Sequence, residues 1–292
     1  MCNSHGLRLQ VVRWEMPVGR FGCCPQNVLH STIAQKNRIM FDFFFKKREL
    51  LPLPYKRELH CHIIPGVDDG SQQMDESLLL LSEMSRFGVE RVIFTPHHTA
   101  PRFMNTPEII QPLFDEVKQK AAEQKIPIEC EGFSFEYRLD ESFIELMQTG
   151  KYGEPACQIR PLYGQYLLIE NSFSHVIPAF DELAERLLSD GYYLVLAHPE
   201  RYLYYAGHRG RFYHHLQERQ VEFQVNMLSF AGYYGEVSKK MAYWMLENGY
   251  VNFLGSDSHH PQHMKLLDKF LRSKDYAAIY DQLCDCIGND HF

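Results

Sequence analysis

From about residue 56 onward the sequence alternates two patterns, and this alternation restricts its fold more than any other feature. Short runs of β-branched and aromatic residues are followed by longer segments with helical spacing. Runs that are apolar throughout are typical of a parallel sheet covered by helices. The predicted strands are 58–63, 91–95, 126–131, 166–170, 192–197, 221–226 and 251–256, and helices fit 75–87, 107–124, 177–189, 209–219 and 236–247.

Seven such strands with intervening helices predict an α/β fold that closes as a β/α barrel. A doubly wound open sheet is the alternative, but no Gly-rich phosphate-binding turn follows the first strand. Pro107 after Thr106 suits the start of a helix, whereas Gly88, Gly191 and Gly249 suit the ends of helices. The local signals therefore agree with strands that each lead into a helix.

Composition and charge exclude several classes of protein. Apolar residues make up 45% and charged residues 23%, as in folded globular proteins. No apolar run approaches the ~20 residues of a membrane span, and no apolar region follows a basic start as in a secretory signal. The net charge is −7, without a basic face for nucleic acid. The eight cysteines are scattered and lack zinc-finger spacing, so we predict reduced thiols in a cytoplasmic protein.

The beginning of the chain lacks the strand–helix alternation. Residues 1–55 are predicted to be an N-terminal extension, and residues 56–292 the barrel. The stretch 50–54 contains two prolines and suits a linker. Met40 opens a segment that resembles a protein start, so we expect residues 1–39 to be upstream sequence outside the working protein. An intact mass of the native protein that includes residues 1–38 would contradict this expectation.

Polar residues gather at the carboxyl end of nearly every predicted strand, and the chain contains 15 histidines. In β/α barrels these ends converge on one mouth, where active sites lie. Six separate motifs would therefore meet in space. They contribute His60, His62 and Asp69 after the first strand, then His97, Glu136 and Glu170, then His198 and Arg201 after the fifth strand, and Asp257 and His259 after the last.

The residue types in these motifs suit metal ions. His60 and His62 are two positions apart on a strand, so both point to one face and Cys61 points away. Asp257 and His259 repeat this spacing. Imidazoles and carboxylates suit zinc, iron or manganese, and a set without thiolate favours a catalytic site with open positions. A single histidine or glutamate at a strand end is more often a hydrogen-bonded core residue, but six motifs together argue against that interpretation.

The six motifs are HCHIIPGVDDG at 60–70, TPHH at 95–98, FEYRLDE at 135–141, LIE at 168–170, AHPERY at 197–202 and GSDSH at 255–259. Together they resemble the polymerase and histidinol phosphatase (PHP) superfamily. The HPERY and PGVDDG elements resemble in particular its bacterial capsular-polysaccharide tyrosine phosphatase branch, the CpsB/YwqE-like enzymes. The match covers roughly residues 56–275, with the motifs in family order.

The resemblance implies a distorted, TIM-like (β/α)7 barrel of the PHP type. It also implies two to three divalent metal ions, with Mn²⁺ expected and Fe or Zn as alternatives. Carried over by position, the ligands of the first ion would be His60, His62, Glu136 and Asp257. Glu136 would bridge to a second ion held with Glu170 and His198, and a third would be held by Asp69, His97 and His259.

The resemblance further implies a protein-tyrosine phosphatase that acts on a bacterial tyrosine autokinase controlling capsule or exopolysaccharide export. Arg201 would contact the substrate phosphate. Asp69, His198 and His259 are candidates for assisting the leaving tyrosyl oxygen. Arg102 follows the second motif and could also reach phosphate, or be an exposed loop cation. Within residues 56–292 no cysteine is followed by arginine six positions later, so no phosphocysteine intermediate is expected.

Some alternatives stay open. A histidinol-phosphatase-like enzyme would act on a small phosphomonoester. An amidohydrolase-like enzyme often uses a carboxylated lysine, and no lysine stands at a strand end here. A non-catalytic metal-binding partner of the kinase would have no need of open metal positions. Relatives can carry an arginine after the last motif, where this chain has His260 and His263. These histidines either replace that arginine as a phosphate contact or are solvated, and we expect the second. The oligomeric state, including a homo-oligomer, is also open.

Overall fold

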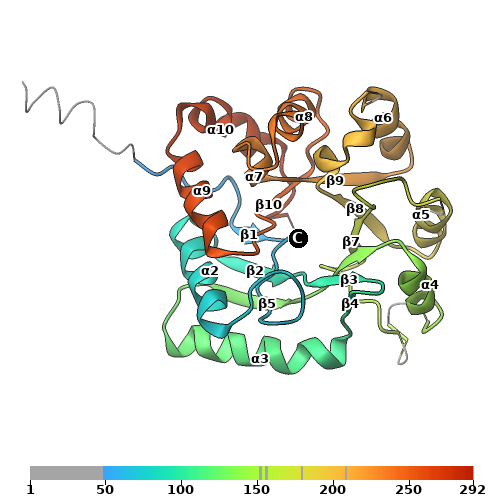
Figure 1. Cartoon of the computed structure of the whole chain (residues 1–292), viewed down its shortest axis with the longest axis horizontal. Helices are drawn as coiled ribbons and strands as arrows, with labels where there is room; N and C mark the ends of the chain where they lie inside the picture. Colours follow the sequence, from blue (N-terminus) through green and yellow to red (C-terminus); the bar gives the residue numbers. More distant parts are fainter. Residues whose placement is uncertain (1–48, 151–152, 155–156, 179, 208, 292) are drawn as a thin grey trace, which may run out of the picture. The chain divides into compact units, whose positions relative to one another are not determined.

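The computed structural model describes residues 49–150, 153–154, 157–178, 180–207 and 209–291. The strands of this part lie in the middle and the helices flank them (Figure 1). The fold is therefore mixed α/β, as the alternation predicts. The prediction that residues 1–39 are upstream sequence concerns residues outside the described part of the chain.

The described residues contain two sheets. In the first, β2 (Arg91–Phe94) lies between β1 (Arg57–Glu58) and β5 (Glu129–Phe133), and all three strands are parallel. The second sheet is parallel except for the antiparallel pair of β3 and β4 at one edge. Its order is β10 (Phe253–Gly255), β9 (Val221–Asn226), β8 (Tyr193–Ala197), β7 (Tyr166–Glu170), β6 (Glu136–Arg138), β3 (His97–Thr99) and β4 (Phe103–Met104).

The predicted helices are present, the one at 236–247 with its predicted ends and the others with one or both ends shifted by one to three residues, and further helices occur that the periodicity did not predict. Those predicted are α2 (Met74–Arg86), α3 (Pro107–Glu123), α5 (Phe180–Ser189), α6 (Arg209–Glu218) and α8 (Glu236–Glu247). The others are α4 (Glu141–Met147), α7 (Met227–Phe230), α9 (Pro261–Leu271), α10 (Lys274–Cys286) and the 3-10 turns η1 (Pro199–Arg201) and η2 (Leu203–Tyr205). Thr106 is the N-cap of α3, with Pro107 in its first turn, as expected.

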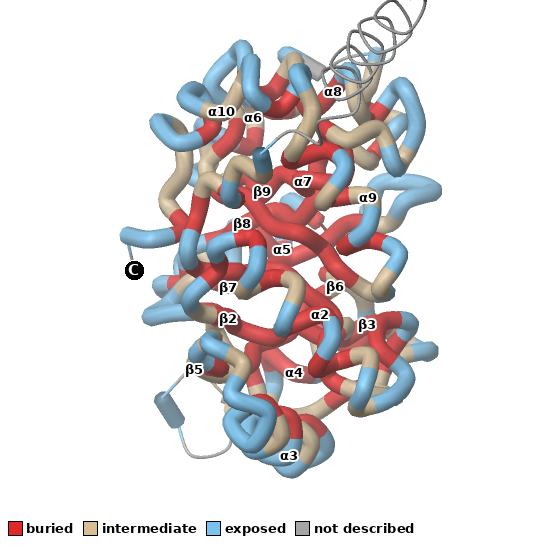
Figure 2. The backbone as a smooth tube through the Cα atoms, turned by 90° about the vertical axis from the view of Figure 1, so that its left-hand side faces the viewer, coloured by how far each residue is buried: buried red, intermediate tan, exposed pale blue. Residues whose placement is uncertain are grey.

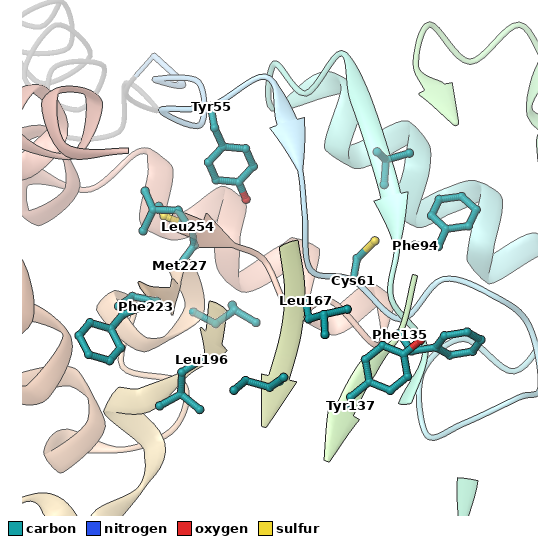
Figure 3. Packing of buried hydrophobic residues seen from close by; sticks show 14 of the residues in the cluster. Tyr55, Cys61, Phe94, Phe135, Tyr137, Leu167, Leu196, Phe223, Met227 and Leu254 are labelled. Carbon is teal, nitrogen blue, oxygen red and sulfur yellow. The ribbon is translucent and has the colours of Figure 1, made fainter. Parts of the chain in front are cut away.

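The central strands are buried on both faces, which explains why their sequences are apolar throughout (Figure 2). Leu167 and Leu196 belong to the large cluster that the helices pack against (Figure 3). Leu168 and Val195, one position away, belong to a smaller second cluster. Because side chains alternate between faces, Glu170 shares the face of Leu168. The smaller cluster therefore lies on the face that carries the polar strand ends.

The two sheets meet where the first and last strands end. Cys61 forms an isolated parallel bridge with Ser258, and the amide of His62 donates to the carbonyl of Ser258 over 3.0 Å. On the other side, the amide of Thr95 donates to the carbonyl of Cys61 over 3.0 Å. These bonds place the His60–His62 segment between the second strand and the Asp257–His259 segment.

The predicted linker at 50–54 packs against the core instead. Leu53 and Tyr55 are buried and belong to the large cluster. The amide of Leu53 donates to the carbonyl of Phe87 over 2.8 Å, and the hydroxyl of Tyr276 donates to the carbonyl of Pro52 over 2.5 Å. Residues 50–54 are therefore part of the packed unit and do not form a linker, although they contain two prolines.

Candidate metal centre

The strand ends bring the predicted ligands together in one buried cluster. His60 and His62 lie on the same face of the first strand, and Cys61 points into the large apolar cluster, as predicted. The imidazole nitrogens Nε2 of the two histidines are 3.3 Å apart. Six of the predicted ligands have side chains that are at most 2% exposed: His60, His62, Glu136, Glu170, His198 and Asp257.

Glu136, at the start of β6, lies among four imidazoles. Its Oε1 is 2.7 Å from His198 Nε2. Its Oε2 is 2.9 Å from His97 Nδ1 and 3.4 Å from Nε2 of both His60 and His62. Glu170, at the end of β7, lies behind it, with Oε2 4.0 Å from His198 Nε2. The position of Glu136 among these nitrogens suits a carboxylate that bridges two cations.

Asp257 faces the same two histidines from the last strand. Its Oδ1 lies 3.5 Å from His60 Nε2 and 3.4 Å from His62 Nε2. Its backbone φ of 48° is left-handed, a conformation that aspartate tolerates better than most residues. This turn aims the carboxylate at the HxH pair.

A more exposed group of side chains lies outside these ligands. Asp69 Oδ1 is 3.4 Å from His97 Nε2 and 3.6 Å from His259 Nε2. The Asp69 side chain is 47% exposed, whereas His97 and His259 are 13% and 15% exposed. The third predicted ligand set therefore lies nearest the solvent.

Four sets of side chains have ligand atoms within 4.8 Å of one another. They contain eight of the nine predicted ligands, and the grouping differs because His60, His62, His97 and Glu136 each belong to two sets. Asp69 belongs to none of the four. The sets are His60–His62–Asp257, His60–Glu136–His198, His97–Glu136–Glu170 and His62–His97–His259.

Electrostatics favour the anionic form of two carboxylates in this cluster, Glu136 and Asp257. Burial opposes ionisation of Glu136, but His60, His97 and His198 lower its pKa well below the ordinary value. Burial likewise opposes ionisation of Asp257, and His60 and His259 lower its pKa. Burial and the charge of Glu136 raise the pKa of Glu170 to about 7. The cluster therefore concentrates negative charge that nearby cations would stabilise.

Several buried polar atoms here lack a hydrogen-bond partner among the described residues. They include Glu136 Oε2, Glu170 Oε2 and His198 Nδ1. His97 Nδ1 also lacks one, because its 2.9 Å approach to Glu136 does not have hydrogen-bond geometry. Burying such atoms unpaired is costly. Divalent ions with nitrogen and oxygen ligands would use these lone pairs, so the side chains present fit a metal centre.

Four buried residues outside the predicted ligand set hold the ligands in place, and one of them, Asp68, lies within the first motif. Gln224 Oε1 lies 2.7 Å from His60 Nδ1, and Asp68 Oδ2 lies 2.9 Å from His62 Nδ1. Asn226 Nδ2 donates to Asp257 Oδ2 over 2.7 Å. Glu58 accepts from the amides of His60 and Ser256, and so ties the first strand to the last. Such partners orient metal ligands and fix their tautomers.

Arg201 lies beside the cluster at the wall of a pocket of about 260 Å3. Its Nη1 donates to Asp257 Oδ2 over 2.7 Å, and its guanidinium lies 4.5 Å from the ring centre of Phe173 and 3.9 Å from that of Tyr234. His260 is exposed as expected, but His263 is buried. Its Nδ1 accepts from the amide of His259, which fixes the loop and explains why the solvated interpretation of His263 is wrong.

Arg102 lies apart from Arg201. It lines a neighbouring pocket of about 380 Å3, together with Arg138, a residue that the motifs did not single out. The two pockets share Asp69, His97 and Phe173 as wall residues. Arg102 is therefore next to the cluster, but it does not line the pocket that contains Arg201.

Gly70→Ala is expected to destabilise the protein by about 1–3 kcal/mol, because overpacking a buried turn forces backbone shifts. A Cβ on Gly70 would collide with the carbonyl oxygen and Cβ of His62 and lie 2.9 Å from Asp68 Oδ1. Denaturant unfolding measures the loss. Gly132→Ala is the matched control, since a Cβ there meets no atom within 4 Å. Equal stability of the two variants would contradict the close packing of this turn.

A mixed α/β fold with histidines and carboxylates at the carboxyl ends of its parallel strands defines a candidate metalloenzyme. The sequence model of the family described as "Capsular polysaccharide synthesis, CpsB/CapC" matches residues 57–269. This chain belongs to that family. The predicted family is thus confirmed.

Relatives and a solved structure agree with this assignment. The chain is 28% identical to "Tyrosine-protein phosphatase YwqE" of Bacillus subtilis over 203 residues, which cover 69% of this chain and 76% of that protein. It is 29% identical to "Tyrosine-protein phosphatase CpsB" of Streptococcus pneumoniae over 208 residues, 69% of this chain and 82% of that one.

The solved structure belongs to a study of YwqE from Bacillus subtilis and CpsB from Streptococcus pneumoniae, described as "unique metal-dependent tyrosine phosphatases". It superposes with a TM-score of 0.64 at 25% identity, over 80% of this chain and 95% of that chain. The fold of this chain is therefore that of the metal-dependent relatives. Among the described residues, no helix is long and apolar enough to cross a membrane.

Proposed function

We propose that this chain is a metal-dependent protein-tyrosine phosphatase of capsule or exopolysaccharide synthesis. One observation carries the proposal: a buried cluster of imidazoles and carboxylates, with several lone pairs unused, adjoins a pocket that contains Arg201. Membership of the family supports the same function, since its relatives are named as tyrosine phosphatases.

The fold proposed for this activity is the distorted (β/α)7 barrel of the PHP type, built from residues 56–292. Hydrogen bonds that continue from one sheet to the other support it. The amide of Asp257 donates to the carbonyl of His60, and the amide of His62 donates to the carbonyl of Ser258. On the other side, β2 leads into β3 and β5 leads into β6 after two residues. These contacts join the strand ends around one mouth.

The proposed ligands are those predicted from the motifs, with two to three ions, Mn²⁺ expected and Fe or Zn as alternatives. The shared position of Glu136 among His60, His97 and His198 supports a bridging role. Divalent ions would supply positive charge for the phosphoryl oxygens and lower the pKa of a water nucleophile. The protein side chains would bind the phosphate and donate a proton to the leaving tyrosyl oxygen.

Arg201 is the proposed phosphate contact. Asp257, Phe173 and Tyr234 hold its guanidinium in one orientation, which lowers the entropy lost when a phosphate binds. A planar guanidinium matches two phosphate oxygens at once. Arg201 would thus orient the phosphoryl group for in-line attack.

The group that donates a proton to the leaving tyrosyl oxygen is proposed from Asp69, His198 and His259. Asp69 is the most exposed of the three and lines both pockets, so a leaving group in either pocket would approach it. Burial lowers the pKa of His198 to about 4, so its imidazole is neutral at physiological pH. This favours a ligand role for His198.

The proposed protein substrate is a phosphorylated tyrosine autokinase of polysaccharide export, in the cytoplasm. The names of the relatives support phosphotyrosine on a protein as the substrate class. Comparing kcat/KM for a phosphotyrosyl peptide and for histidinol phosphate tests this class. A clear preference for the peptide is expected, whereas a preference for histidinol phosphate would favour the small-molecule phosphatase.

Thiol alkylation is expected to leave phosphotyrosyl hydrolysis intact, whereas a chelator should abolish it. Cys61 and Cys130 are buried, and burial raises the pKa of both thiols, so neither is a reactive thiolate. Cys2 and Arg8 have the spacing of a cysteine-phosphatase loop, but they lie outside the described residues. Loss of activity on alkylation with the metal content unchanged would contradict a metal-only mechanism.

A further inference from the structure

The pocket beside the candidate centre that does not contain Arg201 has a pair of arginines to which the proposed mechanism gives no role. Arg102 and Arg138 both line this pocket of about 380 Å3. Asp69, His97 and Phe173 form a wall that it shares with the Arg201 pocket. A substrate whose phosphate enters the Arg201 pocket would therefore have neighbouring groups within reach of the second pocket.

The two arginines differ in how they are held. Arg138, at the end of β6, has Nη2 3.2 Å from Glu170 Oε1, while its Nε is buried and lacks a hydrogen-bond partner among the described residues. Arg102 lies next to β4 with its guanidinium 4.8 Å from the ring centre of Phe103. Arg102 is exposed and has no ion-pair partner in the described part of the chain. Both therefore retain donors that a ligand could use.

The charge of this pocket depends on the metal centre. Its carboxylates are Asp69 and Glu170, and both are proposed metal ligands. When bound cations neutralise these two carboxylates, the guanidinium groups of Arg102 and Arg138 would be the main charges on the rest of the pocket wall. Guanidinium groups bind carboxylate and phosphate oxygens through paired, charge-assisted hydrogen bonds.

We propose that Arg102 and Arg138 form an anion subsite for an acidic group that lies close to the phosphotyrosine in the substrate sequence. This inference rests on the proposed phosphatase function. The group is a carboxylate of Asp or Glu, or the phosphate of a second phosphotyrosine. In an extended peptide, residues two positions apart are separated by roughly 7 Å, so one segment can occupy two adjoining pockets.

Three phosphotyrosyl peptides, identical except at the positions two residues before and two residues after the phosphotyrosine, test the subsite. These positions carry Gln, Glu or a second phosphotyrosine. The readout is the ratio of kcat/KM for each acidic peptide to that for the Gln peptide, because a general defect cancels in this ratio. For the wild type we expect a ratio of about five at low salt, the order of one exposed ion pair, and a smaller ratio at high salt.

Arg102→Gln should bring this ratio close to one, and Arg102→Lys should restore part of it. Arg211→Gln, at an exposed arginine of α6, is the matched control and should keep the wild-type ratio. Arg102 is the residue to change, since Arg138 contacts Glu170 and its loss would also disturb a proposed ligand.

The outcomes separate the subsite from the phosphatase function. A wild-type ratio of one, or a ratio that Arg102→Gln leaves unchanged, would overturn the subsite while phosphotyrosyl hydrolysis stands. A raised ratio for only one of the two acidic peptides would identify which anion the subsite accepts. No hydrolysis of any of the three peptides by metal-loaded protein would overturn the proposed function and this inference with it.

Discussion

Glu136→Gln is expected to lower kcat for phosphotyrosyl hydrolysis by a factor on the order of 10³. The substitution keeps the shape of the side chain but removes its charge. An amide cannot bridge two cations as a carboxylate can, and Glu136 lies within 3.4 Å of nitrogens of four histidines. Bound metal per chain, measured by elemental analysis, should fall together with kcat.

Glu116→Gln is the control for this prediction, because Glu116 is an exposed carboxylate of α3. It should bind metal and hydrolyse phosphotyrosine as the wild type does. A Glu136→Gln protein that keeps full activity and full metal content would show that the carboxylate at the middle of the cluster is not a ligand.

Arg201→Ala is expected to lower kcat/KM for phosphotyrosyl peptides by about a hundredfold, the order of a lost charge-assisted pair of hydrogen bonds. The guanidinium is the positive side chain of the smaller pocket, and three neighbours hold it in place. Steady-state kinetics should show much of the loss in KM, because Arg201 binds the phosphate before reaction as well as during it.

Arg211→Ala again supplies the comparison, since this arginine is exposed on α6. Bound metal is measured in both arginine variants, because Arg201 also donates to the proposed ligand Asp257, and this measurement separates loss of phosphate binding from loss of a ligand. If Arg201→Ala and Arg211→Ala have the same kcat/KM, the phosphate contact lies elsewhere.

The candidate ligands could be predicted from the sequence because each sits in a short motif at a strand end. The two-residue spacing of a strand was enough to select His60 and His62 as side chains on one face. The same spacing selected Asp257 and His259. The convergence of distant motifs followed from one rule about parallel strands. No packing detail was required.

The supporting residues could not be predicted in this way, since their roles depend on contacts far apart in the chain. Gln224 and Asn226 look like ordinary polar residues of a strand until β9 places them beside His60 and Asp257. Glu58 binds Ser256, 198 positions away. The contact between Arg138 and Glu170 likewise joins residues that are far apart in the sequence.

Element ends were also predicted less well than element types. The first predicted strand, 58–63, is shorter in the structure. Only Arg57 and Glu58 form β1, and Cys61 forms an isolated bridge, because the later residues turn into the cluster. The antiparallel strand β4 has two residues, too few for a periodic signal. The linker interpretation failed because prolines mark a break in backbone pairing but not in packing.

The central claim is that the cluster of histidines and carboxylates is a metal centre that hydrolyses phosphotyrosine. A titration of Mn²⁺ into metal-stripped protein, with bound metal per chain and phosphotyrosyl hydrolysis followed together, tests it most directly. We predict that hydrolysis appears only as ions bind, and that His60→Ala loses both bound metal and activity. Full activity of the metal-stripped protein, or of His60→Ala, would contradict the account.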